Sequence, residues 1–68
     1  MREIKIKEEF IKLDSLLKFS GLVMTGGEAK TVIKDGEVLV NGEVCTARGK
    51  KIRVGETVEF ENQKIVVV

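Results

Sequence analysis

Apolar and polar positions alternate along much of the chain, with two interruptions at helical spacing. Residues 3–7 show the period-two pattern of a half-exposed strand. The same pattern returns in the second half and predicts short strands over 38–40, 43–44, 52–54, 57–60 and 64–68. In the fourth of these, Val58 and Phe60 are expected to point inward. The last strand is β-branched and nearly uncharged, so it needs a pairing partner to avoid being an adhesive edge.

The first helical stretch begins at Leu13 and is two turns long. Asp14 is expected to be its N-cap or a first-turn acid, and Gly21 to end it. Phe19 is expected to join the inward stripe from its edge. That stripe consists of Leu13, Leu16, Leu17 and Ser20. A helix this short is unstable alone in water, so it must pack against its neighbour.

The second helical stretch starts after Thr25 and leads into a β-hairpin. Thr25 and Glu28 have capping-box spacing, and Met24 is placed to pack onto the helix as a hydrophobic staple. Gly36 stands where a left-handed residue is needed to end the helix. The dipeptide Asn41-Gly42 is a strong hairpin signal, because both central positions of that turn need positive φ.

The second helix has two distinct faces. Apolar positions recur at i, i+3 and i+4, at Ala29, Val32 and Ile33. Lys30 and Lys34 are four residues apart and share another face. Together the patterns predict an α+β domain covering residues 1–68, with two short packed helices followed by a small antiparallel sheet of three to five strands.

The composition limits which kinds of functional site the chain can form. The chain of 68 residues has one cysteine and no histidine, which excludes disulfide frameworks and zinc clusters. Cys45 lies near Arg48 and is the one candidate for a reactive thiol, but a half-buried core thiol is the favoured interpretation. The acids Glu56, Glu59 and Glu61 are better explained as a solubilising face than as a paired-carboxylate site. We therefore predict no catalytic residues, no metal site and no cofactor.

Targeting signals are not apparent in the sequence. No apolar run approaches the roughly 18–20 residues of a membrane span. Met1-Arg2-Glu3 does not begin a signal peptide, and a single thiol suits a reducing compartment. We expect a soluble cytoplasmic protein without a membrane partner.

Positive charge is concentrated in one segment, although the net charge is only +1. Residues 45–55 carry no acid and four bases, Arg48, Lys50, Lys51 and Arg53. Local fields of this kind attract polyanions, and Gly49 lets a ligand approach the backbone closely. The alternative is an ordinary solvated loop.

The chain also resembles a known family. The resemblance rests on Ala29-Lys30-x-Val32-Ile33-x-x-Gly36-x-Val38-x-Val40-Asn41-Gly42, with Leu13-Asp14 and Leu17 upstream and Val54-Gly55-Glu56-x-Val58 downstream. This pattern is similar to the RNA-binding domain first described in ribosomal small-subunit protein four, the S4 or alpha-L domain. It covers roughly residues 13–60. The Gly-Gly after Thr25 and the basic run around Arg48 resemble its small stand-alone YaaA/YbcJ-like members.

The resemblance implies which residues face RNA. The loop containing Arg48, and the position of Lys30, lie on the RNA-facing side of S4 domains. Lys34, and Lys18 on the first helix, are further candidates. Typical members have Ser-Arg where this chain has Thr25-Gly26, so a main arginine contact is missing. Gly26 and Gly27 either expose helix amides to a phosphate or let the helix pack close to another backbone.

These observations together predict a non-catalytic protein that docks structured RNA. The resemblance implies ribosomal RNA, a role in ribosome assembly, and ribosomal or assembly-factor proteins as further partners. With no Tyr or Trp, and at least two of the three Phe expected on apolar stripes, stacking on splayed bases is disfavoured. Two alternatives remain open: a β-grasp module, although the C-terminal Gly-Gly of carriers is absent, and a protein-interaction module using the C-terminal edge for strand addition.

Overall fold

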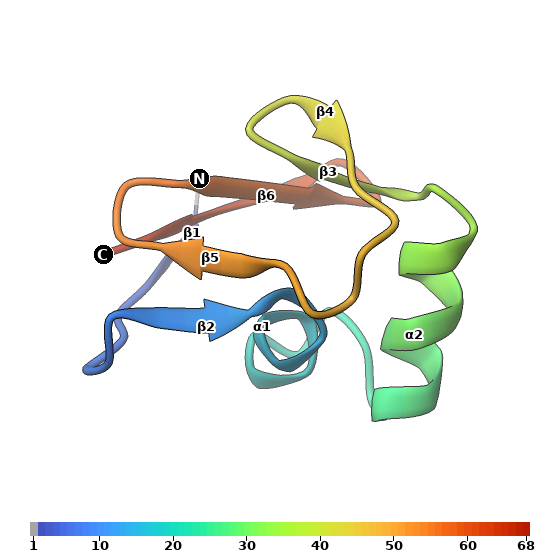
Figure 1. Ribbon diagram of the computed structural model, residues 1–68, viewed down its shortest axis with the longest axis horizontal. Helices are drawn as coiled ribbons and strands as arrows, with labels where there is room; N and C mark the ends of the chain where they lie inside the picture. Colours follow the sequence, from blue (N-terminus) through green and yellow to red (C-terminus); the bar gives the residue numbers. More distant parts are fainter. Residues whose placement is uncertain (1) are drawn as a thin grey trace.

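The computed structural model, which describes residues 2–68, contains seven short strands and two helices that lie together on one side of the strands (Figure 1). In chain order the elements are β1 (Arg2–Ile4), β2 (Phe10–Lys12), α1 (Leu13–Phe19), α2 (Gly26–Lys34), β3 (Val38–Val40), β4 (Glu43–Val44), β5 (Lys51–Arg53), β6 (Thr57–Phe60) and β7 (Gln63–Val67). The predicted α+β class, with two packed helices, is confirmed.

The strands form two sheets. The larger has the order β1-β7-β6-β3-β4, and the smaller pairs β2 with β5. All neighbours are antiparallel except β1 and β7, which run parallel with Arg2 opposite Ile65. The expectation of a wholly antiparallel sheet following the helices was therefore wrong. Period-two patterning identifies a strand, but its partner and direction depend on tertiary folding.

The C-terminal strand lies inside the large sheet. β7 pairs with β6 on one side and β1 on the other, so its apolar residues have the pairing partners they need. The strand-addition alternative, which required an exposed C-terminal edge, loses its structural basis. The edges of the large sheet are β1 and β4.

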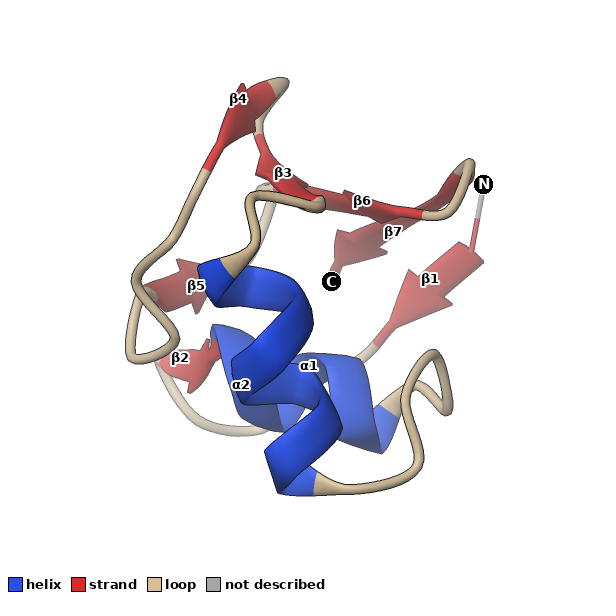
Figure 2. Cartoon of the chain, turned by 90° about the vertical axis from the view of Figure 1, so that its right-hand side faces the viewer, coloured by secondary structure: helices blue, strands red, loops and turns tan. Residues whose placement is uncertain are grey.

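The helices and the two sheets enclose one core (Figure 2). The inward stripe of α1 is confirmed, and the Ser20 hydroxyl donates to the Leu17 carbonyl oxygen at 3.0 Å. The predicted burial of Phe60 and Val58 is confirmed as well. The fully buried side chains of the core are Leu13, Leu16, Leu17, Val23, Ala29, Ile33, Val38, Ile52, Val58, Ile65 and Val67.

Two predicted apolar contacts were wrong, that of Phe19 with the core and that of Met24 with the second helix. Phe19 is 68% exposed and Met24 is 80% exposed. After Gly21 the chain folds back so that the amides of Leu22 and Val23 donate to the Leu17 carbonyl at 3.1 and 3.3 Å. Val23 consequently fills the core beside the end of α1. Leu22 packs against the core while partly buried, and Met24 remains exposed.

The predicted ends of α2 are confirmed. The Glu28 amide donates to Thr25 Oγ1 at 3.0 Å, while Glu28 Oε1 accepts from the amide of Met24 at 3.0 Å. At the other end Gly36 has φ +78°, and its amide donates to the Ile33 carbonyl at 3.1 Å. In α1 the N-cap position is Lys12, so Asp14 is a first-turn acid.

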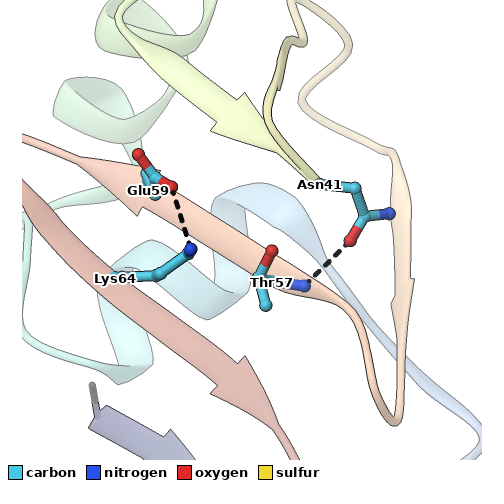
Figure 3. Close-up of polar contacts among 4 residues, drawn as sticks. All are labelled: Asn41, Thr57, Glu59 and Lys64. Atoms are coloured by element: carbon cyan, nitrogen blue, oxygen red, sulfur yellow. Dashed lines mark hydrogen bonds and ion pairs between the residues drawn. The ribbon is translucent and has the colours of Figure 1, made fainter.

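The hairpin turn also matches its prediction. Asn41 and Gly42 have φ values of 52° and 85°, and the side-chain oxygen of Asn41 accepts from the Thr57 amide at 3.0 Å (Figure 3). The strand predicted over 52–54 is displaced by one residue: β5 spans Lys51–Arg53, and Val54 is exposed in the following turn. No helix within residues 2–68 has the length and apolar character needed to cross a membrane.

Candidate nucleic-acid interface

The basic loop between β4 and β5 is fastened to the amino end of α1 by its own backbone. The Leu13 amide donates to the Lys50 carbonyl at 2.9 Å, and the Asp14 amide donates to the Arg48 carbonyl at 3.1 Å. First-turn amides have no partner within their helix, so the loop carbonyls satisfy them. The side chains of Arg48 and Lys50 take no part in this anchoring and are exposed.

The small sheet continues the basic loop. Lys51 and Arg53 on β5 lie opposite Lys12 and Phe10 on β2, while Ile52 lies opposite Ile11. Ile52 is fully buried. Because successive side chains of a strand point to opposite faces, the other two pairs lie on the outer face.

Lys12 was missed by the sequence analysis. It stands directly before the first helix and was assigned to no strand. The available signal was the short alternation of residues 10–12, in which a single apolar residue separates an aromatic from a cation. Only the pairing with β5 shows that Lys12 shares a face with Lys51.

The two lysines of α2 occupy one exposed side of that helix. Each directly follows a fully buried residue, Ala29 or Ile33, and both are exposed. The loop from β4 runs beside the carboxyl half of α2 on its way to α1 in both views (Figures 1 and 2). At the end of α2, a Cβ added to Gly36 would lie 3.6 Å from Val44 Cγ1.

The remaining predicted residues lie away from the loop. Lys18 is exposed in the last turn of α1, whereas the loop is bonded to the first turn. Thr25 and Gly26 are at the amino end of α2, and the loop passes its carboxyl half (Figure 1). The structure does not bring these three residues together with Arg48 and Lys50.

Close packing does not explain the glycines at the start of α2. A Cβ on Gly26 would meet nothing within 4 Å, and one on Gly27 would only meet Thr25 Oγ1 at 3.9 Å. Of the two interpretations of these glycines, close packing and exposed helix amides, only exposed amides agree with this geometry. The carboxylate of Glu28 already lies in this turn and offsets the positive end of the helix dipole, which weakens an anion site here.

Acidic side chains leave the predicted cations largely unpaired. Within residues 2–68 the one ion pair closer than 4.0 Å joins Lys64 and Glu59 at 3.5 Å, on the outer face of the large sheet (Figure 3). Glu56 lies nearer the loop. The Arg53 amide, which donates to it, holds its pKa below the usual value of 4.5, with help from Asn41 and the charges of Lys50 and Arg53.

The single thiol is half-buried against the core, as predicted. Cys45 Sγ lies 3.7 Å from the Ala47 carbonyl oxygen, so it helps to shape the start of the basic loop. In the described part of the chain, no three His, Cys, Asp or Glu side chains are grouped so that they would hold a metal ion.

Known proteins share this sequence and fold. The sequence model of the S4 domain matches residues 4–68. RlbA of Bacillus subtilis, a probable ribosome maturation protein, is 43% identical over 58 residues, which are 85% of this chain and 82% of RlbA. YbcJ of Escherichia coli is 39% identical over 62 residues, covering 91% of this chain and 89% of YbcJ.

Solved structures agree with this assignment. The solution structure of YbcJ, reported to reveal an alpha-L motif involved in RNA binding, matches with a TM-score of 0.76 over 100% of this chain and 87% of that chain. The 30S ribosomal protein S4e of Thermoplasma acidophilum has a TM-score of 0.70 over 85% of this chain and 31% of that chain; at 19% identity it shows a shared fold. From its sequence and its architecture, this chain belongs to the S4 domain family and has the alpha-L fold.

Proposed function

We propose that this protein is a non-catalytic RNA-binding protein that docks structured RNA through one basic face. We use "basic face" for the exposed cations of α2, the β4–β5 loop and β5, namely Lys30, Lys34, Arg48, Lys50, Lys51 and Arg53. The observation that carries the proposal is the anchoring of the loop to α1 by main-chain bonds alone. This arrangement holds the cationic side chains outward without using them for folding.

The proposed mechanism is electrostatic docking. Cations that neutralise phosphates release condensed counterions, which favours binding in a way that depends steeply on salt. Gly49 adds no side chain between Arg48 and Lys50, and a Cβ there would meet nothing within 4 Å, so the loop backbone is also open to a ligand. Such a surface recognises the shape of a phosphate backbone rather than base identity.

Ribosomal RNA is the proposed target, and ribosome assembly is the proposed setting. The name of RlbA refers to ribosome maturation, and the structure of YbcJ is described in terms of RNA binding. Both relatives are matched over more than four-fifths of their length, so the likeness concerns nearly whole proteins. Cytoplasmic localisation and contacts with ribosomal or assembly-factor proteins follow from the same setting and form part of the proposal.

The test is a salt titration with purified ribosomal RNA. Four to six phosphate contacts give a log–log slope of roughly −3 to −5. Arg48→Ala and Lys50→Ala should each weaken binding to every RNA tested. Because their carbonyls, not their side chains, hold α1, both variants should stay folded, with the free energy of unfolding changed by about 0.5 kcal/mol or less.

Lys64→Ala is the matched control. It also removes one exposed cation, but from the outer face of the large sheet, where the Glu59 pair contributes about 1 kcal/mol or less. It should leave RNA affinity close to that of the wild type. A flat salt response, or equal effects of Lys64→Ala and Lys50→Ala, would contradict docking through the basic face. Loss of the circular dichroism spectrum in Lys50→Ala would show that the loop side chains are structural.

A further inference from the structure

The outer face of the small sheet carries an arrangement that the basic face does not explain. Lys12 and Lys51 are direct cross-strand neighbours, and so are Phe10 and Arg53. Side chains of such pairs on one face lie with Cβ atoms about 4.5–5.5 Å apart. Three cations and one aromatic ring therefore share a patch that is only two strands wide.

The lysine pair is electrostatically unfavourable in the protein alone. Like charges directly opposite each other destabilise a sheet. Over residues 2–68 neither lysine has an acidic oxygen within 4.0 Å. A bound anion placed between the two ammonium groups would convert this repulsion into two favourable contacts. The pair is thus suited to a phosphate.

Phe10 holds the neighbouring cations. Lys51 Nζ lies 4.9 Å from the centroid of its ring, and Arg53 Cζ lies 5.7 Å from it. Both distances are within the range of cation–π attraction. The ring therefore restricts two long side chains that would otherwise be mobile, and cations already held in position bind an anion at lower entropic cost.

We propose that Lys12 and Lys51 together bind one phosphate of the RNA backbone, and that Phe10 is a positioning residue for this site. The inference rests on the proposed function and extends it to a surface that includes Lys12. The small-sheet site adjoins the basic loop. Lys50 directly precedes Lys51 in the chain, and the Lys50 carbonyl accepts a hydrogen bond from the amide of Leu13, the residue that follows Lys12. An RNA strand leaving the basic loop would pass over the small sheet next.

The first test is Lys12→Gln, with Lys64→Gln as the matched control. A phosphate contact changes the salt slope by about 0.7–0.9. Between 1 M and 0.15 M salt, this corresponds to about four- to six-fold in affinity. We expect Lys12→Gln to lose this factor for purified ribosomal RNA and Lys64→Gln to lose none. Unchanged affinity in a folded Lys12→Gln variant would overturn the proposal.

The double variant tests whether the two lysines share one phosphate. Two independent five-fold losses would multiply to about 25-fold. If the lysines share one phosphate, Lys12→Gln combined with Lys51→Gln should weaken binding by clearly less than this product. A double variant that reaches the full product would show two independent contacts and would overturn the shared site.

The role of Phe10 is tested with Phe10→Leu and Phe10→Tyr. Leucine keeps an apolar strand residue but removes the ring, so affinity should fall by about two-fold, and tyrosine should restore it. In a Lys51→Gln, Arg53→Gln background the same leucine substitution should have no effect. An equal loss in that background would show that Phe10 acts on RNA or folding by another route.

The two proposals can fail separately. If Lys50→Ala weakens RNA binding while Lys12→Gln does not, docking through the basic face is supported and the phosphate site on the small sheet is contradicted. If wild-type protein binds no ribosomal RNA at any salt concentration, the proposed function fails first, and the small-sheet site fails with it. Equal binding of wild type to heparin and RNA, with no effect of Lys12→Gln on either, would also overturn the site.

Discussion

Asn41 and Glu56 are joined side chain to side chain: Asn41 Nδ2 donates to Glu56 Oε2 at 3.0 Å. The other carboxylate oxygen of Glu56 accepts from the Arg53 amide at 2.7 Å, and the side-chain oxygen Oδ1 of Asn41 accepts from the Thr57 amide at 3.0 Å. The turn between β3 and β4 is thereby bonded to the turn between β5 and β6. Since β5 begins where the basic loop ends, this junction helps to position the proposed RNA site.

Replacing Asn41 should separate its two contributions to stability. Asn41→Gly keeps the left-handed backbone but loses both side-chain hydrogen bonds, which costs about 1–2 kcal/mol. Asn41→Ala loses the same bonds and adds about 1 kcal/mol for a Cβ at φ 52°. Urea denaturation should rank wild type above Asn41→Gly and Asn41→Gly above Asn41→Ala. Equal stability of the two variants would show that backbone strain contributes nothing.

Glu56 should make stability depend on acid pH. Its pKa is lowered in the folded protein, chiefly by the Arg53 amide. A lowered pKa means that the ionised form is stabilised by folding, so this contribution is complete above the usual value of 4.5 and is lost as pH falls through the folded pKa. Unfolding free energies of wild type and Glu56→Gln should therefore differ at neutral pH and converge as the pH falls through the lowered pKa of Glu56 in the folded protein. A gap that is constant with pH would contradict ionisation as the cause.

Two glycine-to-alanine changes should have opposite effects. Gly36→Ala places a Cβ at φ +78°, which costs about 1–2 kcal/mol although the nearest atom is at an ordinary 3.6 Å. Gly26→Ala adds a Cβ in open space at the start of α2 and should be neutral or stabilising by up to about 1 kcal/mol. Thermal melts monitored by circular dichroism would show this. Unchanged RNA affinity in Gly26→Ala would argue against a phosphate at the amides there.

Two phenylalanines should respond very differently to truncation. Phe60 is 4% exposed and Phe19 is 68% exposed. Phe60→Ala leaves a cavity and should cost about 3–5 kcal/mol, enough to unfold much of so small a domain. Phe19→Ala should change the free energy of unfolding by about 0.5 kcal/mol or less. Calorimetry on both variants checks the contrast, and strong destabilisation by Phe19→Ala would mean that Phe19 packs into the core.

Features confined to a few neighbouring residues could be predicted from the sequence. The Thr25 cap, the glycine that ends α2 and the Asn41-Gly42 turn each depend on bonds within about one turn of chain. The resemblance to the S4 family covered the same region and named the family correctly. Phe19 was misplaced because it lies within α1 but off the inward stripe of that helix. Met24 was misplaced because the chain folds back after Gly21, and helical spacing says nothing about residues beyond a helix end.

The candidate site also has some residues that the sequence could predict and others that only the structure shows. The segment of four cations was visible as a composition signal, and these residues remain the centre of the proposal. Lys12 was invisible as a site residue, because its importance comes only from lying opposite Lys51. Lys18 and Thr25 were predicted as site residues beside Lys30, Lys18 as a weaker candidate. In the structure Lys18 lies in the last turn of α1 and Thr25 is the N-cap of α2.

By itself, the sequence determined both helices and most of the strands, the caps and turns, the inward faces of both helices and the family, but not β2. These features depend on interactions between residues a few positions apart, so their spacing is visible in the sequence. Only the tertiary structure decided that β1 joins β7 in parallel, that β2 pairs with β5, and that Arg48 is bonded to the backbone of Asp14. Such contacts join residues far apart in the sequence and depend on how the whole core packs, so no periodic pattern along the chain predicts them.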